Sequence, residues 1–108
     1  MAKVYASHHV EGTYGHKTRV TFRPAIDFTG KTVDACMRVG GRLIDLTTSG
    51  PTDDGCGGAF VDITWQQGEL VCGCHEIGIV VTGASSLEEY PCGNDKILAI
   101  VRKGVVNV

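Results

Sequence analysis

Short runs of alternating apolar and polar residues, separated by glycine-rich turns, constrain the fold of this chain more than any other feature. Alternation with a period of two is the pattern of a β-strand with one buried face. Of the 108 residues, 30 are β-branched, and such side chains favour a pleated strand over a helix. Fifteen glycines further disfavour long helices. The sequence therefore predicts one all-β domain.

About six or seven such runs follow one another, with turn signals roughly every 8–12 residues, as in a β-sandwich or barrel. The central run ends in the segment 57–65, and the strongest run is 74–81. We expect a β-sandwich domain over 17–103, an N-terminal arm or edge strand over 1–16 and a tail over 104–108. The inward positions of the runs predict a core of Val20, Phe22, Val33, Ala35, Met37, Val61, Ile63, Ile77, Ile79, Val81, Leu98 and Ile100.

The charge and hydropathy of the chain bear on several classes of partner. Its net charge is −2 with a pI near 6.0, and no run of basic residues predicts a nucleic-acid-binding surface. No apolar stretch is long enough for a transmembrane helix, so we expect no membrane partner. The first residues lack the apolar core of a signal peptide, so we expect the chain to be made in the cytoplasm. In that compartment its five cysteines should mostly be free thiols.

The sharpest local cluster of reactive residues is the segment 72–75, Cys-Gly-Cys-His. Cys72 and Cys74 fall on one face of a strand, and Cys56 or Cys92 from a loop would supply a third zinc ligand. Paired Cys-x2-Cys motifs are absent, so free thiols are the preferred interpretation, and a disulfide from Cys92 to Cys56 or Cys72 stays open. We expect no metal and no cofactor. If a metal is bound, the candidate ligands are Cys72, Cys74 and Cys92.

No arrangement of residues predicts catalysis. Cys74 and His75 point to opposite faces of a strand, as do His8 and His9, so neither pair forms a nucleophile and base or a chelate. The serine-hydrolase elbow and the phosphate-binding loop motifs are missing. We therefore expect that the chain is not an enzyme.

Four segments, in this order, carry a family resemblance: 28–33, 58–65, 71–81 and 90–97. Over about residues 17–102 the chain resembles the immunoglobulin-like N-terminal domain of phage baseplate upper proteins and related tail-fibre attachment modules. The resemblance implies a single immunoglobulin-like antiparallel β-sandwich of about seven strands. It also implies a non-enzymatic virion structural protein of a tailed phage, acting as an adaptor in the tail, baseplate or fibre-attachment region.

Two alternatives to the tail adaptor stay open. One is a capsid cement, or decoration, protein. The other, from a different class, is a small cysteine-based metal-binding or redox module. A carbohydrate-binding sandwich would need spare surface aromatics, and aromatic residues make up only 6% of the chain.

In this interpretation the chain functions by assembling with other virion proteins. Edge strands and apolar chain ends favour docking on a neighbour, and the resemblance favours a homo-oligomer, with a trimer preferred. Residues 1–16 are expected to run along or pair with another chain rather than fold back into their own core. Trp65 ends a strand, where a tryptophan more often caps the core than binds a partner. The interface candidates are Val4, Tyr5, His8, Val10, Tyr14, Trp65, Tyr90, Val105 and Val106.

Overall fold

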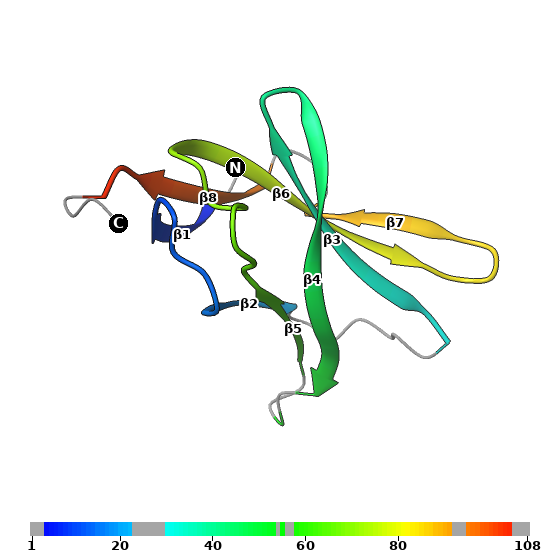
Figure 1. Ribbon diagram of the computed structural model, residues 1–108. Coiled ribbons are helices and arrows are strands. Elements are labelled where there is room, and N and C mark those ends of the chain that lie inside the picture. The colour runs from blue at the N-terminus through cyan, green and yellow to red at the C-terminus, as the bar shows by residue number, and fades with distance from the viewer. Residues whose placement is uncertain (1–3, 23–29, 54, 56–57, 92–94, 105–108) are drawn as a thin grey trace.

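The computed structural model describes residues 4–22, 30–53, 55, 58–91 and 95–104. These residues form eight strands and no helix, so the predicted all-β class is confirmed, and none of them belongs to a helix that could cross a membrane (Figure 1). The strands are β1 (Val4–Val10), β2 (Lys17–Phe22), β3 (Thr32–Val39), β4 (Arg42–Asp53), β5 (Ala59–Thr64), β6 (Gly73–Thr82), β7 (Leu87–Tyr90) and β8 (Lys96–Arg102).

All eight strands belong to one sheet, in the order β1-β8-β6-β3-β4-β5-β2, with β7 paired to β6. The long strand β4 turns the sheet over on itself, because residues 42–46 pair with β3 and residues 47–53 pair with β5. A register shift between Ser49 and Thr52 marks a bulge, a feature that bends a strand. The result is a single sheet nearly closed like a barrel, where two separate sheets were expected.

The barrel stays open along a seam between β1 and β2. These strands are the two ends of the sheet order, and no described strand pairs with the outer edge of either. Strand β1 pairs with β8 over its whole length, from Val4 opposite Lys96 to Val10 opposite Arg102, and this pairing is parallel. The expectation that residues 1–16 do not fold back into the chain's own core is therefore wrong for 4–10, which form an edge strand of its own sheet and bury His9. The other described strand pairs are antiparallel, so the predicted mostly antiparallel arrangement is confirmed, with β1 and β8 as the parallel exception.

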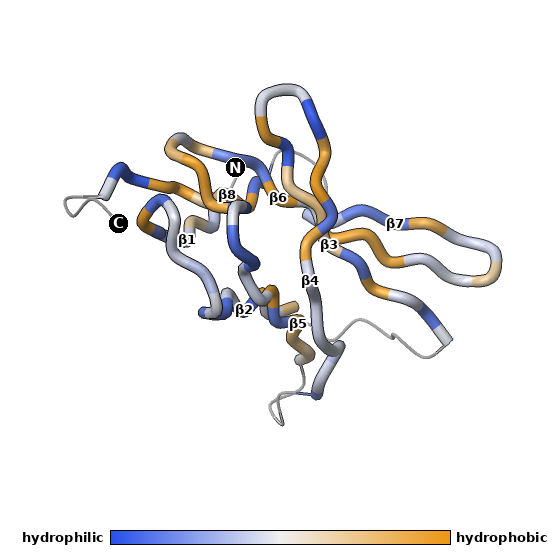
Figure 2. The backbone as a smooth tube through the Cα atoms, in the orientation of Figure 1, coloured by the Kyte–Doolittle hydropathy of each residue, from blue (hydrophilic) through white to orange (hydrophobic). Residues whose placement is uncertain are grey.

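The core lies between the two halves of the folded sheet, and most of its predicted members are buried. Apolar stretches of β6 and β8 line it, as Figure 2 shows along these strands. Val20 is only half-buried, because it lies at the open seam. The predicted residues that are buried are Phe22, Val33, Ala35, Met37, Val61, Ile63, Ile77, Ile79 and Val81.

The predicted inward face of β8 is wrong. Ile97, Ala99 and Val101 are buried, whereas Leu98 and Ile100 lie on the other face and are half-buried. Residues 97–101 are all apolar, so this run carries no alternation from which a face can be derived. Pairing with β6 decides the face, because Ile97 lies opposite the buried Ile77, and directly opposed residues share a face.

Candidate functional site

The loop 11–16 closes one end of the seam between β1 and β2. Within this loop, the Gly12 N–H donates to the Leu70 carbonyl at 3.2 Å, and the Gly15 N–H donates to the Trp65 carbonyl at 2.8 Å. The Trp65 N–H in turn donates to the His16 carbonyl at 3.0 Å. These bonds attach the loop to the end of β5 and the turn that follows it. We call this region the closed end of the seam.

His9 fills the closed end. It is only 7% exposed although β1 is an edge strand, and its ring packs edge-on against Trp65 with centroids 5.0 Å apart. His9 Nε2 lies 2.7 Å from Ser7 Oγ, and His9 Nδ1 lies 3.0 Å from His16 Nε2. A neutral imidazole satisfies both partners, because it has one donor and one acceptor nitrogen. Burial, followed by the nearby His16 and His8, lowers the pKa of His9 from its ordinary value of 6.5.

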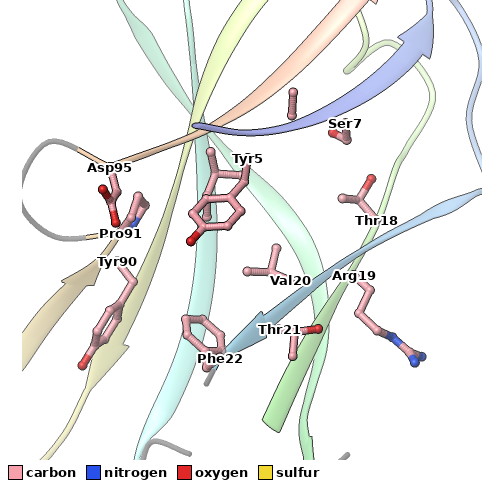
Figure 3. A pocket seen from close by; sticks show the side chains of 12 residues that line it. Tyr5, Ser7, Thr18, Arg19, Val20, Thr21, Phe22, Tyr90, Pro91 and Asp95 are labelled. Carbon is pink, nitrogen blue, oxygen red and sulfur yellow. The ribbon is translucent and has the colours of Figure 1, made fainter. Parts of the chain in front are cut away.

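The other end of the seam opens into a cleft of about 500 Å³, which we call the open end. In Figure 3 the Tyr5 side chain extends from β1 into this cleft, toward Val20 and Phe22 of β2. The Phe22 ring meets the Tyr90 ring edge-on at 5.7 Å. The lining is mostly apolar and is made by Tyr5, Ala6, Ser7, Thr18, Arg19, Val20, Thr21, Phe22, Tyr90, Pro91, Asp95 and Ile97.

The outward face of β2 is basic and well ordered by contacts with β5. Arg19 donates to both carboxylate oxygens of Asp62, at 2.9 and 3.2 Å, and its guanidinium lies 3.7 Å from the centre of the Phe60 ring. The bond to Arg19 lowers the pKa of Asp62, and the same bond raises the pKa of Arg19. Lys17 is also exposed on this face. Strand β2 therefore presents Val20 and Phe22 to the cleft, and it presents Lys17 and the Asp62-paired Arg19 to solvent.

The structure brings two of the interface candidates, Tyr5 and Tyr90, together as walls of the cleft. Trp65 is completely buried, with its Nε1 donating to Thr18 Oγ1 at 2.8 Å, so it offers no surface to a partner. Val105 and Val106 lie outside the described residues. The remaining candidates do not line the cleft and are Val4, His8, Val10 and Tyr14.

Sequence reasoning missed the cleft and the contacts around His9. The alternation of residues predicts that Val20 and Phe22 face inward. It does not predict that their strand lies at an edge of the sheet, beside a strand with which it does not pair. The contact of His9 with His16 depends on a loop that brings the chain back beside β1. The only signal in the sequence was the alternation that puts Ser7 and His9 on the same face of a strand.

The cysteines do not form a metal site within the described part of the chain. Cys72 and Cys74 are exposed, Cys36 is half-buried, and all three are free thiols. Burial is the main cause that raises the pKa of the Cys36 thiol. No group of three or more histidine, cysteine, aspartate or glutamate side chains is placed to hold a metal ion among these residues. Cys56 and Cys92, the further predicted ligands, lie outside the described residues.

Comparison of the chain with protein-family models, curated proteins and solved structures finds no match. The resemblance to phage attachment modules therefore stays a prediction from four sequence segments. The cleft at the open end is the feature from which a function can be argued.

Proposed function

We propose that the chain is a non-enzymatic assembly protein that binds another polypeptide at the open end of the seam. The observation that carries this proposal is the apolar cleft between two strands that each end the sheet. Tyr5 is 53% exposed and extends into the cleft, whose walls include the Tyr90 and Phe22 rings that contact each other. Aromatic residues gathered in a concave patch are typical anchors of protein interfaces.

The virion setting of the proposal comes from the sequence resemblance, and the strand order supports the immunoglobulin-like part of it. The central strands of that fold form one layer in the order G-F-C and another in the order B-E-D. Strands β8-β6-β3 and β2-β5-β4 take the corresponding places, with β4 joining the layers. We propose an immunoglobulin-like fold whose layers are continuous through β4.

The proposed place of action is the tail, baseplate or fibre-attachment region of a phage virion, after synthesis in the host cytoplasm. The proposed partners are other virion proteins and further copies of the chain, with a trimer favoured and neither nucleic acid nor membrane involved. Sedimentation of the purified protein measures the oligomer directly.

Two matched tyrosines test whether the cleft is the binding surface. Tyr5 and Tyr14 are exposed to similar extents, 53% and 58%, but only Tyr5 lines the cleft. Virions are produced with the wild-type chain, with Tyr5→Ala or with Tyr14→Ala, and the amount of chain in purified particles is measured by immunoblot. We expect Tyr5→Ala to lower incorporation and Tyr14→Ala to leave it unchanged. Equal incorporation of the two variants would contradict the proposal.

Immunogold labelling of the same particles tests the location. Label on the tail supports the adaptor role, and label spread over the head favours the capsid cement protein. Particles without any label would reject the virion setting. Stoichiometric zinc in the purified chain would instead favour the metal-binding alternative built on Cys72, Cys74 and Cys92.

A further inference from the structure

The cleft runs along the facing edges of β1 and β2, because its lining includes residues 5–7 of one strand and 18–22 of the other. Nearly all pairs of Cα atoms between β1 and β2 are more than 8 Å apart. Neighbouring strands in a sheet are about 4.8 Å apart, so two strands on either side of a third are separated by about 9.6 Å. The cleft lies between the same two strands at the open end. A separation above 8 Å along this cleft is thus compatible with a single extended segment lying beside β2.

The outer edge of β2 gives that segment a hydrogen-bonding partner. In an antiparallel ladder every second residue of an edge strand directs its N–H and C=O away from its neighbour. The Trp65 N–H donates to the His16 carbonyl, and the register continues with Thr18 opposite Ile63 and Val20 opposite Val61. The backbone groups of Arg19 and Thr21 consequently face the free edge. A ligand that can hydrogen-bond to such a row of backbone N–H and C=O groups is itself an extended polypeptide.

The two faces of β2 specify the side chains of the added strand. Its inward residues would enter the apolar cleft beside Val20 and Tyr5. Its outward residues would lie beside Lys17 and Arg19. Because Arg19 is already paired with Asp62, Lys17 carries the preference for an opposite charge on a directly opposed residue. Asp95 does not oppose this arrangement, because Figure 3 shows it on the far wall, away from β2.

We propose that a segment of another virion protein, with alternating apolar and acidic residues, adds as a strand to the free edge of β2 within the cleft. This inference rests on the proposed function and names the chemistry of the partner. The segment would extend the layer formed by β2, β5 and β4, and its apolar side chains would fill the cleft next to Tyr5 and Phe22.

Synthetic peptides of three designs test the inference. One alternates valine with glutamate, the second replaces each glutamate by lysine, and the third is the glutamate peptide with N-methylated backbone amides. Binding to the full chain is followed by two-dimensional amide NMR. We expect the glutamate peptide to bind about tenfold more tightly than the lysine peptide. The shifts should map to 17–22 and Tyr5, and the N-methylated peptide should not bind.

A charge reversal sharpens the test. Lys17→Glu should reduce the preference for the glutamate peptide, whereas the same change at the exposed Lys103, which lies after β8 and outside β2, should leave the preference unchanged. Both variants replace exposed residues, and their spectra report whether they fold.

Three results would overturn the inference. The first is that no peptide binds, or that shifts map outside β2 and the cleft. The second is a shift of the β2 amide signals when the concentration of the chain is raised without any peptide. Such a shift would show that a second copy of the chain binds this edge. The third is protection of the Arg19 and Thr21 amides in the dilute free protein, because another part of the chain would then already pair with β2. If these peptides fail while Tyr5→Ala still lowers incorporation into virions, the proposed function stands and this inference does not.

Discussion

The closed and open ends of the seam contain the same two strands, yet different kinds of residue fill them. At the closed end, His9 and Trp65 are buried against each other, and backbone hydrogen bonds attach the loop 11–16 to residues 65 and 70. At the open end, Tyr5 and Val20 stay partly exposed around a cleft. The comparison teaches that two strands which do not pair with each other can secure the barrel at one end and leave a surface for a partner at the other.

The largest expected effect comes from removing the tryptophan of the closed end. Trp65→Ala leaves a cavity in the core and removes the bond to Thr18, so we expect a loss of about 3–5 kcal/mol in the free energy of unfolding. Tyr5→Ala, at the open end, should change it by no more than about 0.5 kcal/mol. Urea denaturation followed by circular dichroism measures both. Similar losses in the free energy of unfolding for the two variants would show that the two ends of the seam contribute equally to stability.

A smaller loss in the free energy of unfolding is expected on acidification, because the pKa of His9 is lowered in the folded protein. The unfolded state therefore binds a proton more readily below the ordinary pKa of 6.5. The stabilisation is therefore complete above pH 6.5 and falls as the pH decreases toward the folded-state pKa. The loss amounts to about 1.4 kcal/mol for each unit by which the pKa is lowered.

Two variants distinguish the contribution of His9 to the pH dependence from that of its neighbour His8. Urea denaturation at pH 7.5 and at lower pH should show that His9→Gln reduces the pH dependence of stability. His8 is exposed and contributes the least of the three causes that lower the pKa, so His8→Gln should largely retain that dependence. Equal pH dependence in His9→Gln and the wild type would contradict the role given to the closed end.

The buried face of a strand could be predicted from the sequence where apolar and polar residues alternate. It could not be predicted where pairing with a neighbouring strand decides which face is buried. Val61 and Ile63 of β5, and Ile77 and Ile79 of β6, could be placed in the core because polar or small residues separate them. The uniformly apolar β8 had no such signal, and its face follows from its register with β6.

The candidate site was predictable only in part. Tyr5 and Tyr90 are both predicted interface residues. They line one cleft because β1 pairs with β8, which pairs with β6, and β6 also pairs with β7. The burial of His9 and Trp65 depends on the return of the loop 11–16. Local sequence patterns do not encode contacts between such distant segments.

Amide hydrogen exchange in the free protein tests most directly whether one end of the seam secures the fold while the other is open. The amides of Gly15 and Trp65 are hydrogen-bonded at the closed end, so we expect them to exchange only through large-scale unfolding. The amides of Arg19 and Thr21 face the free edge of β2 and should exchange rapidly. Protection of Arg19 and Thr21 equal to that of Trp65 would contradict this description, because the edge of β2 would then already be covered.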